Sequence, residues 1–150
     1  MVALDTDVLV LAFAFHRDER HEANARFLEL IRETSPVTTI YTVMELLGQL
    51  SFNLPAERLS QWPVWLQNRY RLTVAYPSTT GLDGETFFRR DFVEAPLERM
   101  QQERMPYLDT LILGLVERVD GITALVTWNA RHFRGRTTLP VLTPVEFLMQ

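Results

Sequence analysis

The strongest constraint on the fold is an alternation of short apolar runs with longer stretches of helical spacing. The runs that suit β-strands cover residues 2–5, 37–41, 72–76, 122–127 and 141–142. Between them, apolar residues recur every three or four positions, most clearly over 21–32 and 107–119. This alternation predicts an α/β fold in which a parallel sheet is covered by helices on both sides.

Length and composition narrow the class of protein further. A chain of 150 residues suits one domain, so we expect residues 1–150 to form a single unit. The sequence has no cysteine, which excludes disulfides, zinc–thiolate sites and cysteine nucleophiles and fits a reducing compartment. No apolar run approaches the length of about 20 residues that spans a bilayer. We therefore expect a soluble, cytoplasmic protein without a membrane segment.

The charge pattern argues against a protein that coats nucleic acids. The formal net charge is −4, whereas such coating depends on many cationic contacts to phosphates. All 15 basic residues are arginine, so mechanisms that need a lysine amine are excluded. Arginine binds phosphate groups well, so the charge pattern does not exclude an enzyme that cuts nucleic acids.

Four polar side chains stand at positions that call for an explanation. Asp5 and Asn129 follow predicted strands, and Glu45 lies about one turn into the helix after another. Asp109 interrupts an apolar helix, where an unpaired carboxylate is costly to desolvate. Ligands of open α/β sheets bind at the carboxyl ends of the strands, so we expect these side chains to converge on one cleft.

Carboxylate and amide oxygens suit Mg²⁺ or Mn²⁺ and disfavour zinc. A cation held by them can activate a water and neutralise a phosphodiester, which predicts metal-dependent hydrolysis. Taken singly, Asp5 and Asn129 are better explained as ordinary helix caps or turn residues.

The order and surroundings of these residues resemble a PIN domain from end to end. The segments that carry the resemblance are VALDTDVL at 2–9, VMEL at 43–46, LDTLI at 108–112, LVTWN at 125–129 with His132 and Phe133 after it, and LTPVEFL at 142–148. The resemblance implies a three-layer α/β/α fold around a mostly parallel sheet of four to five strands. The length of the chain and the coverage of the resemblance point to the VapC-like toxins of this family.

The resemblance also implies a function. Such proteins are Mg²⁺-dependent endoribonucleases, and their metal-binding and catalytic positions match Asp5, Glu45, Asp109 and Asn129. The fourth position is more often aspartate in the family, so Asn129 gives up a formal charge. Asp7 stands where the family usually has asparagine, and it either restores a charge nearby or caps the following turn. The relatives typically form homodimers and bind a small antitoxin protein.

Further residues are candidates for binding RNA. Thr6 and Thr127 are placed to hydrogen-bond a water or a phosphate oxygen, and they are equally ordinary strand-end hydroxyls. Arg131 and Arg134 belong to the densest basic run and suit an RNA backbone, with Trp128 or Phe133 beside them as a surface for base stacking. The alternative is a solvated loop. The expected reaction is attack of an activated water on phosphorus, leaving a 5′-phosphate.

Residues 50–70 carry many aromatic side chains, which fit either an interface for the antitoxin or a second copy, or a buried helix pair.

Two other functions compete with the nuclease. The run Asp5-Thr6-Asp7-Val8 is similar to the haloacid-dehalogenase phosphatase motif, with Asp5 as nucleophile and Asp7 as general acid. The lack of lysine and the presence of Glu45 weigh against it. The second alternative is a PIN-like scaffold that binds RNA or protein without cutting, which Asn129 supports.

Overall fold

The structure, a computed structural model, describes residues 1–79 and 81–150. The strands of the described chain are β1 (Val2–Leu4), β2 (Val37–Thr39), β3 (Thr73–Ala75), β4 (Ala124–Val126) and β5 (Val141–Leu142). They form one five-stranded sheet of order β3-β2-β1-β4-β5, and every neighbouring pair is parallel. The predicted parallel α/β sheet is therefore confirmed.

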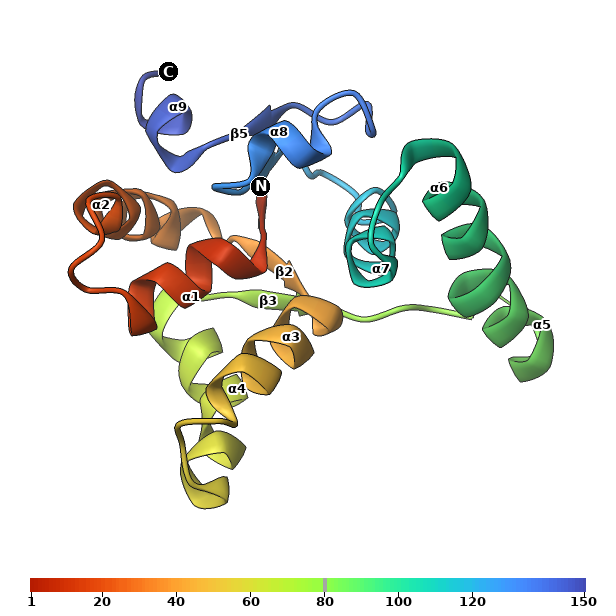
Figure 1. The fold of residues 1–150 in the computed structure, drawn as a ribbon, viewed down its shortest axis with the longest axis horizontal. Coiled ribbons are helices and arrows are strands. Elements are labelled where there is room, and N and C mark those ends of the chain that lie inside the picture. The colour runs from red at the N-terminus through yellow and green to blue at the C-terminus, as the bar shows by residue number, and fades with distance from the viewer. Residues whose placement is uncertain (80) are drawn as a thin grey trace.

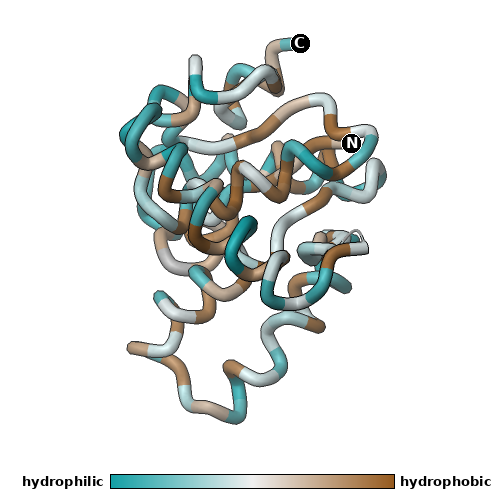
Figure 2. The backbone as a smooth tube through the Cα atoms, turned by 90° about the vertical axis from the view of Figure 1, so that its right-hand side faces the viewer, coloured by the Kyte–Doolittle hydropathy of each residue, from teal (hydrophilic) through white to brown (hydrophobic). Residues whose placement is uncertain are grey.

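Helices surround this sheet. They are α1 (Thr6–Ala14), α2 (His21–Ile31), α3 (Ile40–Leu50), α4 (Ala56–Tyr70), α5 (Gly84–Arg89), α6 (Ala95–Glu103), α7 (Tyr107–Val116), α8 (Ala130–Phe133) and α9 (Pro144–Leu148), with the short helices η1 (Arg32–Thr34) and η2 (Arg90–Glu94). Figure 1 shows α1 and α2 on one side of the chain and α7, backed by α6, on the other. In Figures 1 and 2 the hairpin of α3 and α4 projects from the rest of the molecule. Among the described helices, none is long and apolar enough to cross a membrane.

The two faces of the sheet are buried in two separate apolar clusters. Val2 and Leu4 of β1 belong to one cluster, whereas Ala3 between them belongs to the other. This split follows from the geometry of a strand, in which successive side chains point to opposite faces. The first cluster includes Phe27 of α2, and the second includes Ile112 of α7, both fully buried. Helices therefore cover both faces.

The second strand ends earlier than the sequence predicts. We expected a strand over 37–41, but β2 stops at Thr39 and the next residue begins α3. The hydroxyl of Thr39 accepts a hydrogen bond from the backbone N–H of Thr42 at 3.0 Å, which caps the helix. The earlier start of α3 places Glu45 in its second turn.

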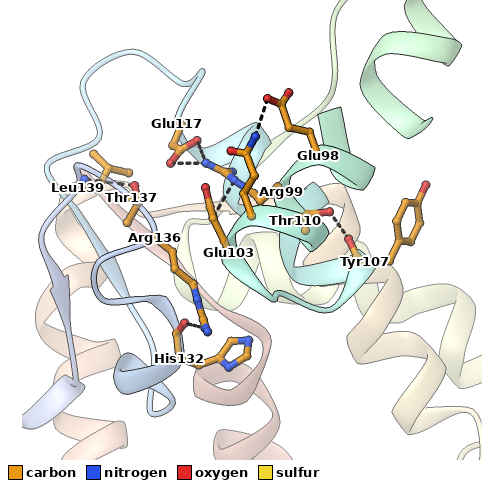
Figure 3. Close-up of polar contacts among 11 residues, drawn as sticks. Glu98, Arg99, Glu103, Tyr107, Thr110, Glu117, His132, Arg136, Thr137 and Leu139 are labelled. Atoms are coloured by element: carbon orange, nitrogen blue, oxygen red, sulfur yellow. Dashed lines mark hydrogen bonds and ion pairs between the residues drawn. The ribbon is translucent and has the colours of Figure 1, made fainter. Parts of the chain in front are cut away.

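Ion pairs hold the segment that covers α7. Arg99 of α6 lies 2.9 Å from the carboxylate of Glu117, which follows the last turn of α7 (Figure 3). Asp91 of η2 is buried and pairs with both Arg90 and Arg118. Burial alone raises the pKa of Asp91, but the two arginines together hold it below its usual value. These contacts fix α7, which carries Asp109.

Candidate active site

The register of two strands creates the centre of the site. Leu4 of β1 pairs with Val126 of β4, so the residues that follow them, Asp5 and Thr127, meet at the carboxyl edge of the sheet. The N–H of Asp5 donates to the carbonyl of Val126 at 3.1 Å. The hydroxyl of Thr127 lies 2.7 Å from Oδ2 of Asp5 and donates to it. Two distant segments of the chain are joined here.

A cleft of about 250 Å³ opens at this edge. It is lined by Asp5, Thr6, Asp7, Val10, Leu11, Phe15, Arg20, Glu45, Gln49, Asp109, Trp128, Asn129 and Phe133. The four residues that the sequence assigned to metal binding and catalysis thus come together in one place. Of the residues assigned to RNA, Thr6 lines the cleft and Thr127 is fully buried. Arg131 and Arg134 lie outside the lining, and Arg134 pairs with Glu146.

Asp5 is both a helix cap and a member of the cleft. Its Oδ1 accepts the N–H of Thr6 at 2.8 Å as α1 begins, and its Oδ2 accepts the hydroxyl of Thr127. Burial, reinforced by the charge of Asp7, raises the pKa of Asp5 to about 7. The cap explanation therefore holds for Asp5, and it does not conflict with a role in the cleft.

The carboxylate of Asp7 binds the residues that follow β4, whereas the sequence had also suggested that it caps the turn after Asp7 itself. Its carboxylate accepts the N–H of Trp128 at 3.1 Å, the N–H of Asn129 at 2.9 Å and the hydroxyl of Thr127 at 3.0 Å. Burial raises the pKa of Asp7, although these hydrogen bonds act in the opposite direction. Because Thr127 has one hydroxyl proton, it donates to Asp5 or to Asp7 at any moment.

Glu45 reaches the cleft from α3 and is half-buried. The buried hydroxyl of Thr6 donates to its Oε2, which ties the start of α1 to α3. Thr6 thus orients a carboxylate that the sequence assigned to the metal site.

Asp109 lies in the first turn of α7, and its carboxylate has an imidazole neighbour to which the sequence gave no role. Nε2 of His132 is buried and lies 3.0 Å from Oδ2 of Asp109, without hydrogen-bond geometry. The two groups attract each other when His132 is protonated. Burial raises the pKa of Asp109, and His132 and Arg136 partly reverse this. Arg136 also donates to the carbonyl of His132 (Figure 3).

Asn129 stands at the N-cap of α8, where its side chain makes no capping hydrogen bond. The residue is exposed and lines the same cleft as the carboxylates.

The donors in the cleft fit a hard divalent cation. The carboxylate and amide side chains that line it offer oxygen ligands, and burial, with the charge of Asp7 as a second cause, raises the pKa of Asp5 to about 7. Within residues 1–79 and 81–150, no three His, Cys, Asp or Glu side chains are grouped so that they could hold a metal ion between them. Mg²⁺ commonly keeps several waters and binds through one or two carboxylates, so the donors still fit it.

The sheet order, the helices on both faces and the acidic cleft at the carboxyl edge define a PIN-like α/β fold. The chain is similar to a chain in the crystal structure of FitAcB from Neisseria gonorrhoeae, with a TM-score of 0.60 and 15% sequence identity. The match covers 97% of this chain and 99% of that chain. No family model and no curated protein sequence matches the chain. At this level of identity the likeness establishes the fold, and the predicted PIN-like architecture is confirmed.

Proposed function

We propose that the chain is a divalent-metal-dependent endoribonuclease that uses Mg²⁺, with Mn²⁺ as a substitute. The observation that carries this proposal is the convergence of Asp5, Asp7, Glu45 and Asp109 on one cleft. They come from the end of β1, from α1, from α3 and from α7, so the fold gathers them at the carboxyl edge of the sheet. The PIN-like fold supports the same function.

The proposed roles follow from the contacts in the cleft. Asp5 and Asp109 would hold the cation, with Glu45 and Asn129 as further oxygen donors. When bound, the cation would supply a Lewis acid for the phosphodiester and a water of lowered pKa. Thr127, through its single hydroxyl proton, orients Oδ2 of Asp5.

Cleavage of RNA tests the proposal directly. The purified chain is incubated with mixed single-stranded RNAs and either Mn²⁺ or EDTA, and the ends of the fragments are analysed. We expect cleavage with Mn²⁺ alone and fragments that carry a 5′-phosphate. Asp109→Asn should abolish it, whereas Asp120→Asn, which removes an exposed carboxylate outside the cleft, should not. Intact RNA with a folded wild-type chain would overturn the nuclease, and binding without cleavage would favour the PIN-like scaffold.

We further propose that this nuclease is a cytoplasmic toxin that pairs with a small antitoxin and forms a homodimer. The hairpin of α3 and α4 presents exposed apolar side chains that suit a protein partner, including Phe52 at 88% exposure, Val64 at 62% and Trp65 at 44%. Hydrophobic positions recur along this hairpin in Figure 2. Light scattering of the purified chain should give the mass of a dimer. Phe52→Glu should leave the fold unchanged and weaken association with the partner or the second copy.

A further inference from the structure

The acidic cleft contains an arginine that the sequence analysis did not single out. Arg20, in the loop between α1 and α2, is the one basic side chain among the described residues that line the cleft. Its Nε lies 2.8 Å from Oδ1 of Asp18 and its Nη2 lies 2.7 Å from Oδ2. These contacts hold one edge of the guanidinium and occupy two of its five N–H groups.

The flat face of the same guanidinium rests on an aromatic ring. The central carbon of Arg20 lies 5.6 Å from the ring centre of Trp128, which is within the range of a cation–π contact. The indole N–H of Trp128 donates to Oδ1 of Asn24 at 2.8 Å, and Asn24 donates to the carbonyl of Val8 at 2.9 Å. Asn24 is fully buried. Asp18 and Trp128 therefore fix the guanidinium from two directions.

The negative charge of the cleft suggests a role for Arg20 in binding an anionic ligand. A polyanion that approaches Asp5, Asp7 and Asp109 meets like charge, so its binding needs a cation at the rim. The field of the carboxylates reaches Arg20, because Asp7 adds to the effect of Asp18 in raising the pKa of its guanidinium. A planar arginine fork matches a phosphate group better than a lysine would.

Aromatic surface accompanies the charge. Trp128 is half-buried and Phe15 is exposed by 54%, and both line the cleft beside Arg20. Stacking of a base on an aromatic ring next to a backbone phosphate contact is typical of proteins that bind single-stranded nucleic acids.

We propose that Arg20, held by Asp18 and stacked on Trp128, binds a backbone phosphate of single-stranded RNA at the rim of the cleft, with a neighbouring base against Trp128 or Phe15. This inference rests on the proposed function and specifies how the substrate is held. It assigns the anion-binding task to the loop between α1 and α2, and not to the run that contains Arg131 and Arg134.

Binding without cleavage tests the proposal. A fluorescent single-stranded RNA is titrated with the full chain in Ca²⁺, and the dissociation constant is measured by anisotropy at several salt concentrations. Arg20→Gln should weaken binding about tenfold, as expected for one lost charge-assisted contact. The slope of log K against log salt should fall by about 0.7, the value for one phosphate contact to a single strand. Arg20→Lys should keep the slope and lose part of the affinity, because lysine keeps the charge without the fork.

Arg17→Gln is the matched control, because Arg17 lies in the same loop, is exposed and does not line the cleft. An equal loss of binding in Arg17→Gln, or an unchanged dissociation constant and salt slope in Arg20→Gln, would overturn the proposal.

Kinetics with Mn²⁺ separate this inference from the proposed nuclease. Arg20→Gln should raise KM with little change in kcat. A wild-type chain that binds RNA through Arg20 but leaves it uncut would support the phosphate site and refute the nuclease. Cleavage with an unaltered KM in Arg20→Gln would refute the phosphate site alone.

Discussion

Replacing Asp5 with asparagine should stabilise the metal-free chain at alkaline pH. Asp5 is 8% exposed, and burial with the charge of Asp7 raises its pKa from 3.8 to about 7. At about 1.4 kcal/mol for each pKa unit, the ionised carboxylate lowers the free energy of unfolding by at most roughly 4 kcal/mol. Asp7 titrates with it, so a gain on the order of 2 kcal/mol in Asp5→Asn is the realistic expectation.

The sign of the pH dependence follows from the direction of the shift. The folded chain binds the proton of Asp5 more tightly than the unfolded chain does, because its folded pKa is the higher one. The free energy of unfolding should therefore fall as pH rises from about 4 to about 7, and then stay level. Asparagine has no such proton, so Asp5→Asn should flatten this part of the curve.

Urea unfolding in EDTA at several pH values between about 5 and 8 measures the effect, with Asp120→Asn as a control for the loss of one exposed negative charge. The reasoning fails if the wild-type chain becomes more stable toward alkaline pH, or if Asp5→Asn keeps the wild-type slope.

Further outcomes are expected from the same cleft. Mn²⁺ at about 100 times its dissociation constant should stabilise the wild-type chain by roughly 2.7 kcal/mol near pH 8, seen as a rise in Tm that is lost in Asp5→Asn. An equal rise in both proteins would place the cation elsewhere. Thr127→Val should lower the free energy of unfolding by about 1–3 kcal/mol near pH 8 in urea, because the buried carboxylates of Asp5 and Asp7 lose a donor; no loss would show that the hydroxyl is dispensable.

The centre of the fold was predictable because buried parallel strands are apolar on both faces. The strand predicted over 122–127 contains β4, and the strand predicted over 2–5 contains β1. The error over 37–41 has a local cause. Ile40, Thr42 and Val43 are β-branched and favour a strand by propensity, but the cap from Thr39 and the burial of one face of α3 favour a helix there. At this boundary, helix capping and tertiary packing outweigh the intrinsic strand propensity of the residues.

The residues of the site that stand out in their local sequence were predictable, whereas contacts between segments distant in sequence were not. Asp5 and Asn129 follow strands, and ligands of parallel α/β sheets bind at the carboxyl ends of the strands, so both residues could be predicted from the sequence. Asp109 was predictable because it is a carboxylate within an apolar helix. The contact of His132 with Asp109 and that of Arg20 with Trp128 join segments that only the folded chain brings together. No local pattern distinguishes Arg20 from the other 14 arginines, so its position required the structure.

The departure at Asn129 has a physical explanation in its neighbour. The resemblance to PIN domains suggests asparagine at position 7 and aspartate at position 129, and this chain has the reverse. The two residues are in contact, since the N–H of Asn129 donates to Oδ2 of Asp7 at 2.9 Å. The exchange keeps one carboxylate at this corner and avoids a further negative charge beside Asp5, whose pKa Asp7 already raises. The formal charge of the cleft is thus the same as in the arrangement that the family favours. Asn129 alone is therefore a weak argument for an inactive scaffold, because the carboxylate of Asp7, on α1, lies against Asn129 and lines the same cleft.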